Sequence, residues 1–212
     1  MCGIIGNGVL PYMSIVVGIC GTNFCTFFAD TRLTQIGQAN PYTYSDGFHK
    51  ISKINDRVLF GASGLFMPGE QIVDAIQKCP DLRTASVKVV RRAILQYLKS
   101  HQDKLTTPRC YMIGGREKDG GFVITQIQYD ACLHKISEKH YRPTPPQTDY
   151  GIACSLPESC APHRNQFLDH IVEIVNSCKA HNELKAKVEV YLHKVSPLDE
   201  TVGPDIESVT IL

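Results

Sequence analysis

The chain has 212 residues, of which 43% are hydrophobic, enough to fill one sizeable core. Twenty-two Lys and Arg residues are balanced by 21 Asp and Glu residues, so the formal net charge is +1. This balance argues against the strongly basic surfaces of proteins that bind nucleic acids or anionic membranes. We therefore expect one compact domain that binds neither nucleic acid nor a membrane.

The cysteines and histidines show no pattern of a disulfide framework or a metal site. The nine cysteines are odd in number, form no CxxC pair and lie largely within apolar runs. This usage predicts reduced, buried thiols in a cytoplasmic protein, or a nuclear one in a eukaryote. The eight histidines form no HExxH motif. We expect no metal and no cofactor.

The N-terminal 29 residues carry no charge, but they do not have the pattern of a signal peptide or a membrane span. They lack a basic beginning, and several Gly, Asn and Pro residues interrupt any helix of membrane-crossing length. We interpret residues 1–13 as an N-terminal extension or propeptide, and residues 14–212 as a single domain.

Two mostly apolar runs, residues 14–20 and 24–30, are joined by a short turn that contains Gly and Asn. They predict a β-hairpin. Both alternate sets of side chains in the first run are uncharged, so we expect the hairpin to be covered on both faces. Antiparallel pairing brings the ends of a hairpin together, and Ser14 and Asp30 should therefore be neighbours. This hydroxyl and this carboxylate are the first candidates for chemistry.

A polar, turn-rich stretch over residues 31–47 predicts an exposed excursion. Residues 48–54 and 57–63 then predict a second hairpin, and two helices should follow, over residues 69–78 and from Thr84 onward. The apolar stripe of the second helix recurs at spacings of three and four residues and consists of Val87, Val90, Ile94 and Leu98.

The rest of the chain repeats this order. Strands are predicted over residues 109–115, 122–129, 133–137 and 150–154, helices over residues 156–180 and 183–195, and a last strand over residues 206–212. Two antiparallel sheets packed face to face, with a helix layer outside each, would cover every apolar face. We therefore predict an α+β fold, a four-layer αββα sandwich.

Four motifs resemble those of proteasome β-type subunits and of the related HslV peptidase. They are residues 17–21 (VGICG), 28–32 (FADTR), 49–51 (HKI) and 58–64 (VLFGASG). These families belong to the N-terminal-nucleophile hydrolases, which have the four-layer αββα fold. The resemblance is strong over residues 14–64 and weak between Tyr97 and Pro204.

The resemblance implies a set of catalytic residues. In the family, an N-terminal threonine attacks the scissile carbonyl while its own α-amino group acts as the general base. That position corresponds to Ser14, while Asp30 and Lys50 match the family's aspartate and lysine. Gly64 matches the glycine whose N–H stabilises the oxyanion.

Further positions follow from the same resemblance. Ser155 or Cys154 lies where a supporting serine would fall, and Asp199, or else Glu200, resembles a distal aspartate. The positions that line the family's substrate pocket are apolar here, which implies cleavage after hydrophobic residues; they are Leu33, Phe48, Ala62 and Phe66. The partners implied are polypeptide substrates and other subunits, identical or different, in stacked rings.

Two alternatives remain open at this point. The chain has serine in place of threonine, and Met13 in place of the glycine that precedes the nucleophile in self-processing subunits. An unprocessed Ser14 has no α-amino base, and the chain would then be a non-catalytic, architectural β subunit. The start of the chain also resembles class II glutamine amidotransferases, in which removal of Met1 would expose Cys2 as the nucleophile.

Overall fold

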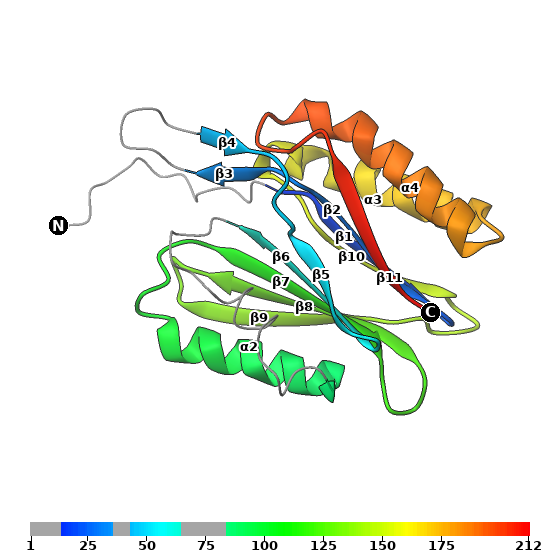
Figure 1. The fold of residues 1–212 in the computed structure, drawn as a ribbon, viewed down its shortest axis with the longest axis horizontal. Coiled ribbons are helices and arrows are strands. Elements are labelled where there is room, and N and C mark those ends of the chain that lie inside the picture. The colour runs from blue at the N-terminus through cyan, green and yellow to red at the C-terminus, as the bar shows by residue number, and fades with distance from the viewer. Residues whose placement is uncertain (1–13, 36–42, 65–83) are drawn as a thin grey trace.

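The computed structural model describes residues 14–35, 43–64 and 84–212. They form a mixed α/β structure with two large sheets, one small two-stranded sheet and three α-helices among these residues (Figure 1).

The first sheet contains both ends of the described chain. Its order is β10-β1-β2-β11, and every neighbouring pair is antiparallel. The predicted first hairpin is confirmed, because Val16 lies opposite Ala29 and Cys20 opposite Cys25. The bounds are β1 Val16–Gly21, β2 Cys25–Asp30, β10 Tyr150–Ser155 and β11 Ile206–Ile211.

The second sheet has the order β5-β6-β7-β8-β9 and is also antiparallel. Its bounds are β5 Ile51–Asn55, β6 Val58–Gly64, β7 Arg109–Arg116, β8 Phe122–Asp130 and β9 Lys135–Tyr141. The last strand begins two residues later than the predicted strand over residues 133–137. The reason is a turn in which Asp130 Oδ1 accepts hydrogen bonds from the backbone N–H groups of Cys132 and Leu133, at 2.9 and 3.0 Å.

A small sheet lies within the stretch that the sequence predicts as an exposed excursion. Strands β3 (Leu33–Gln35) and β4 (Thr43–Ser45) pair antiparallel. These strands are not predicted from the sequence, and the expected exposure is wrong at Thr34, which is 6% exposed. Three-residue strands are too short to show a period in the sequence.

The three helices are α2 (Val87–His101), α3 (Arg164–Ser177) and α4 (His181–Val195). The stripe predicted for α2 is buried as expected. The helix predicted over residues 156–180 is shorter: residues Glu158–His163 form a 3₁₀ helix, and Cys178 is extended. A second 3₁₀ turn, Ser196–Leu198, follows α4. The helix predicted over residues 69–78 lies outside the described residues.

The core forms three clusters, and together they explain why β1 shows no alternation. Ile15, Val17 and Ile19 pack with residues of α3 and α4, whereas Val16 and Cys20 pack with residues of the second sheet. The outer face of the second sheet packs against α2. The two large sheets thus face each other, with α3 and α4 on one side and α2 on the other (Figure 1).

Two glycines leave room for the Phe27 ring between the sheets: Gly18, its partner on β1 of the same sheet, and Gly114, on β7 of the other sheet. A Cβ atom at Gly18 would lie 2.8 Å from Phe27 Cε1, and one at Gly114 would lie 2.7 Å from the same atom and 2.6 Å from Cys25 Sγ. These separations are shorter than van der Waals contact, so the ring occupies space that any larger residue would need.

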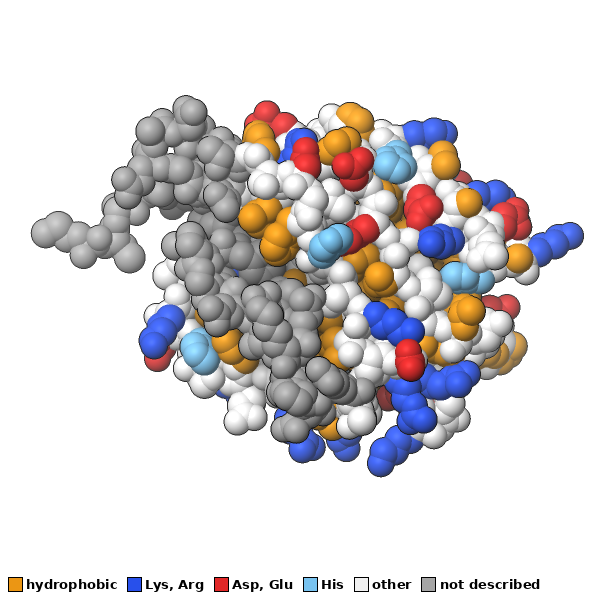
Figure 2. Space-filling model, in the orientation of Figure 1, with side chains coloured by type: hydrophobic (Ala, Val, Ile, Leu, Met, Phe, Trp, Pro, Cys, Tyr) orange, Lys and Arg blue, Asp and Glu red, His pale blue; other side chains and the backbone are white. Residues whose placement is uncertain are grey.

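Acidic and basic side chains are interspersed on the face shown in Figure 2, and hydrophobic side chains occur between them in small groups. This matches the near-zero formal net charge of +1. Within the described ranges, no helix is long and apolar enough to cross a membrane.

Gly114→Ala should destabilise the protein, because the new methyl group would overlap Phe27 and Cys25. We expect the free energy of unfolding to fall by about 1–3 kcal/mol, measured by chemical denaturation. Gly121→Ala is the matched control: its Cβ would have Asp119 Oδ1 as nearest neighbour, at 3.4 Å, and should change stability by less than about 0.5 kcal/mol. Equal losses in the two variants would contradict the close packing.

Candidate active site

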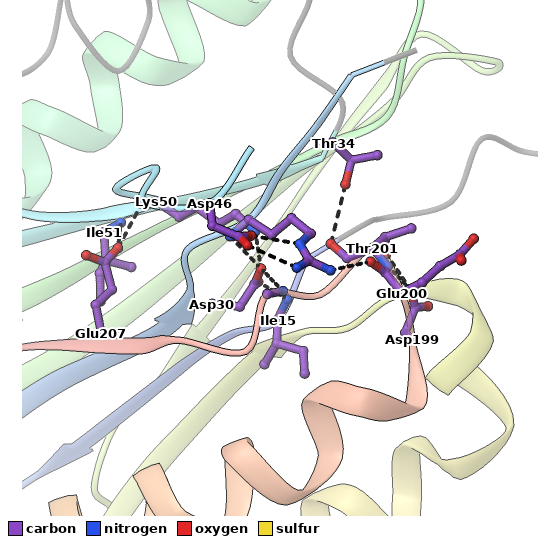
Figure 3. A network of polar contacts seen from close by, with 12 residues as sticks. Ile15, Asp30, Thr34, Asp46, Lys50, Ile51, Asp199, Glu200, Thr201 and Glu207 are labelled. Carbon is purple, nitrogen blue, oxygen red and sulfur yellow. Dashed lines mark hydrogen bonds and ion pairs between the residues drawn. The ribbon is translucent and has the colours of Figure 1, made fainter. Parts of the chain in front are cut away.

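A buried ion pair lies at the end of the first hairpin. Asp30 is the last residue of β2, and its Oδ2 atom accepts a hydrogen bond from Lys50 Nζ at 2.6 Å. The side chains are 0% and 3% exposed. Lys50 comes from the segment that leads into β5, so the pair joins one sheet to the other (Figure 3).

The Asp30 carboxylate also accepts hydrogen bonds from three backbone N–H groups. Ile15 donates to Oδ1 at 2.9 Å, while Arg32 and Gly203 donate to Oδ2 at 3.1 and 2.9 Å. A buried carboxylate is costly unless it is paired and hydrogen bonded. Here four donors from separate parts of the chain meet this requirement, and they fix the carboxylate in one orientation.

Burial lowers the pKa of the Lys50 ammonium group from its ordinary value of 10.5. The attraction of Asp30 and its hydrogen bond, together with the attraction of Glu207, act in the opposite direction. Loss of solvation is the largest of these effects. The ammonium charge of Lys50 therefore depends on its acidic neighbours.

Ser14 lies next to this pair, in a small cavity. Ser14 is 4% exposed. The next residue, Ile15, lies beside Asp30, because Asp30 N donates a hydrogen bond to Ile15 O at 3.3 Å. The cavity is lined by Ser14, Arg32, Leu33, Thr34, Phe48, Lys50 and Gly64. Ser14, Lys50 and Gly64 thus line one cavity together with the apolar residues Leu33 and Phe48.

Gly64 ends β6 with a φ of +123°, a conformation that L side chains rarely adopt. A Cβ atom here would also lie 2.7 Å from the carbonyl oxygen of Pro108. Both facts require glycine, and its backbone faces the same cavity as Ser14.

Ser155 is held at the interface between the sheets. It ends β10, and its hydroxyl lies 2.6 Å from that of Ser63 on β6. Its neighbour Cys154 packs instead into the cluster with α3 and α4. Of the two alternatives at this position, Ser155 is therefore the residue that points between the sheets.

Asp199 and Glu200 follow the second 3₁₀ turn. Asp199 Oδ1 accepts hydrogen bonds from the backbone N–H of Thr201, at 2.8 Å, and from its hydroxyl. The carbonyl oxygen of Glu200 accepts from Arg32 Nη1 at 2.9 Å. Figure 3 shows this segment close to Asp30. Asp199 shapes the loop that leads to Gly203, which donates to Asp30.

The remaining predicted residues are not gathered in this cavity. Ala62 is 1% exposed and packs in the cluster that includes α2, and it is absent from the described cavity lining. Phe66 and Cys2 lie outside the described residues.

Sequence reasoning missed three residues that hold the site together. Arg32 forms two hydrogen bonds with the Asp46 carboxylate, at 2.8 and 3.1 Å; Gly203 donates to Asp30, and Ser63 bonds to Ser155. Arg32 and Ser63 lie within the motifs over residues 28–32 and 58–64, which could have drawn attention to them. Gly203 contributes only a backbone N–H, for which no sequence signal exists.

The described parts of the chain contain no group of three or more His, Cys, Asp or Glu side chains that could hold a metal ion. All seven cysteines in these parts are free thiols. Burial raises the pKa of the Cys110 thiol, near Ser63 and Ser155, to about 11, so this thiol is protonated and a weak nucleophile at neutral pH.

Comparison with known proteins shows similarity in structure but not in sequence. No protein-family model matches the chain, and no curated protein sequence matches it. Among solved structures, Anbu from Yersinia bercovieri, described as an ancestral β-subunit, superposes with a TM-score of 0.60 at 13% identity, over 93% of this chain and 81% of that one.

Two further structures have the same fold. The Gly-1 mutant of Anbu from Hyphomicrobium sp. strain MC1 superposes with a TM-score of 0.56 at 14% identity, covering 93% of this chain and 81% of that one. Eukaryotic HslV from Trypanosoma brucei gives 0.54 at 10% identity, covering 93% and 98%. Similarity at this level of identity concerns the fold alone. At the level of the fold, the chain is therefore HslV-like and proteasome-like.

Proposed function

We propose that the chain is a proteasome β-type or HslV-like subunit that hydrolyses peptide bonds in intracellular protein degradation, with Ser14 as the N-terminal nucleophile. One observation carries the proposal. A single cavity brings together Ser14, the Lys50 ammonium group and the Gly64 backbone, and Lys50 is anchored by the fully buried Asp30.

In this proposal, loss of residues 1–13 gives Ser14 a free α-amino group. This amine takes the proton of the Ser14 hydroxyl while Oγ attacks the scissile carbonyl carbon. The tetrahedral intermediate then collapses to an ester, and the leaving amine of the substrate receives the proton. Water hydrolyses the ester, which restores the hydroxyl and releases the second product.

Lys50 has an electrostatic role in this reaction. A cation beside the α-amino group disfavours its protonated form, so more of the amine is neutral and able to act as a base. Asp30 holds the Lys50 ammonium at 2.6 Å. Because Asp30 is fixed by backbone donors on three segments, the cation is held in place before substrate binds.

Gly64 and the apolar lining suit two further requirements of the reaction, stabilisation of the oxyanion and binding of the substrate side chain. The Gly64 N–H would donate to the oxyanion, and the absence of a side chain lets a substrate come close. Leu33 and Phe48 line the same cavity. Cleavage after hydrophobic residues is the specificity that this lining favours.

The complete architecture is proposed to be the four-layer αββα sandwich over residues 14–212. Such a subunit would work in stacked rings with identical or related chains, in the cytoplasm and, in a eukaryote, the nucleus. The packing of α3 and α4 on one sheet and of α2 on the other supports the layer order.

One observation favours a second candidate, the non-catalytic architectural subunit. The four donors to Asp30 come from residues far apart in the chain. Their role in tying these segments together needs no reaction at Ser14. An intact Met13–Ser14 bond would leave this framework in place without a base.

The first test is the intact mass of the purified assembly together with Ser14→Ala. We expect the mass of residues 14–212 and a covalent adduct on Ser14 after treatment with an irreversible inhibitor of N-terminal nucleophiles. Ser14→Ala should lose the adduct and at least about 10³-fold in kcat. Ser137→Ala, on the exposed edge strand β9, serves as the control.

A chain that keeps residues 1–13 and forms no adduct would rule out the enzymatic proposal. Peptidase activity that survives in Ser14→Ala would assign the reaction to another subunit or residue, and the architectural role would then remain.

A second prediction concerns alkaline pH. Since burial lowers the pKa of Lys50 from 10.5, its charge is lost at a lower pH than that of an exposed lysine. We expect kcat to fall with rising pH, with an apparent pKa below 10.5, because neutral Lys50 would leave the buried Asp30 carboxylate without its ion-pair partner and loosen the site. Lys50→Arg keeps a charge that does not titrate in this range, so its activity should be reduced but should lack this decline. The same alkaline decline in Lys50→Arg would contradict the role of Lys50.

A further inference from the structure

Glu207 makes three contacts at the start of β5. Its Oε1 atom accepts hydrogen bonds from the backbone N–H groups of Lys50, at 3.0 Å, and Ile51, at 3.3 Å. Its Oε2 atom lies 2.7 Å from His49 Nδ1. One carboxylate therefore contacts three consecutive residues, with Lys50 in the middle. Figure 3 shows Glu207 beside Lys50 and Ile51.

These contacts complete the anchoring of Lys50. Its carbonyl oxygen accepts a hydrogen bond from Ala62 N at 2.9 Å, and its side chain binds Asp30 at 2.6 Å. The backbone N–H is the remaining polar group, and Glu207 binds it. Without this acceptor, the N–H of a residue that is 3% exposed would lose its partner, a costly change.

The topology explains why the acceptor comes from the other sheet. β5 is the edge strand of its sheet and β11 the edge strand of the other. On β11, Ile206 lies opposite Asp30 and Glu207 opposite Ala29. Glu207 therefore sits next to Asp30 and reaches across to the strand that carries Lys50.

Glu207 also contributes charge. The charged groups that act on Lys50 are Asp30 and Glu207, which favour its ammonium form, and Arg32, which opposes it. Asp46 is bound to Arg32, and His49 contacts Glu207 from its exposed side. Glu207 is thus a second negative charge near the cation, beyond the one that binds it directly.

We infer that Glu207 is a positioning residue for the proposed reaction: it fixes the backbone of Lys50 and places a second negative charge near the Lys50 side chain. The inference rests on the proposed function, because Glu207 can affect turnover only if the proposed reaction takes place at this site. Glu207 is not among the described residues that line the cavity, so it should affect turnover rather than substrate binding.

Two variants separate the effect of the hydrogen bonds that Glu207 accepts from the effect of its negative charge. Glu207→Gln keeps an oxygen that can accept from Lys50 and Ile51 but has no charge, whereas Glu207→Ala loses both. The matched control is Glu173→Gln, which alters another His–Glu contact, with His170, on the exposed face of α3.

In Glu207→Gln, the pKa of Lys50 should fall, because a negative charge that favours the ammonium is lost. Titration by NMR with ¹³C-labelled lysine measures this change, and the alkaline decline of kcat should move to lower pH with it. Hydrogen exchange of the peptide containing Lys50 and Ile51, followed by mass spectrometry, should stay as in the unmodified protein.

In Glu207→Ala, exchange at the same peptide should become about tenfold faster or more, as expected for loss of a charge-assisted hydrogen bond. The kcat should fall by a similar factor while KM stays nearly constant. Glu173→Gln should change none of these quantities.

Unchanged Lys50 titration in Glu207→Gln, or unchanged exchange in Glu207→Ala, would overturn the positioning role. Both measurements are made without turnover, so they decide the inference even if the unmodified protein is inactive. Absence of turnover and of an inhibitor adduct in the unmodified protein would instead overturn the proposed function. If Glu207→Ala fails to fold, Glu207→Gln still provides the titration test.

Discussion

The structure of the site depends on one buried carboxylate. Asp30 binds Lys50 and three backbone N–H groups at once, so it holds together the start of β1, the end of β2, the start of β5 and the segment before β11. Removing one partner of a buried ion pair typically costs about 3–5 kcal/mol. The same carboxylate therefore serves both stability and the proposed chemistry, and its presence alone does not distinguish a catalytic subunit from an architectural one.

The packing of the hairpin explains why the site forms where it does. β1 and β2 are the central strands of their sheet and are buried on both faces. Their antiparallel pairing brings Ser14, which precedes β1, and Asp30, which ends β2, to the same end of the sheet. In the second sheet, Ser63 and Gly64 form the end of β6 that lies near this site. Close approach of the sheets where Gly114 meets Cys25 and Phe27 limits the distance between the two sets of groups, which is what a preorganised site requires.

Much of the fold was predictable because its signals are local. The first hairpin, the stripe of α2 and the order of strands and helices follow from periodicity and turn residues. The errors have two causes. A single polar group, the Asp130 carboxylate, forms a turn that delays the start of β9. Strands β3 and β4 are too short to show a pattern in the sequence. Within the site, Ser14, Asp30, Lys50 and Gly64 could be named from motifs. Ser63 lies within one of these motifs, but its role comes from a contact with Ser155, 92 positions away. Gly203 and Glu207 lie outside the motifs, and their partners Asp30 and Lys50 are 173 and 157 positions away.

These long separations determine when the site can form during synthesis. Gly203 and Glu207 complete the surroundings of Asp30 and Lys50, yet they lie 173 and 157 positions further along the chain than these partners. Contacts between such distant residues form late and slowly, because a long loop must close first. A nascent chain that has exposed only its first hairpins therefore has Ser14 and Lys50 but not the arrangement that holds them. The chemistry proposed for the finished site would therefore be absent from a partly synthesised chain.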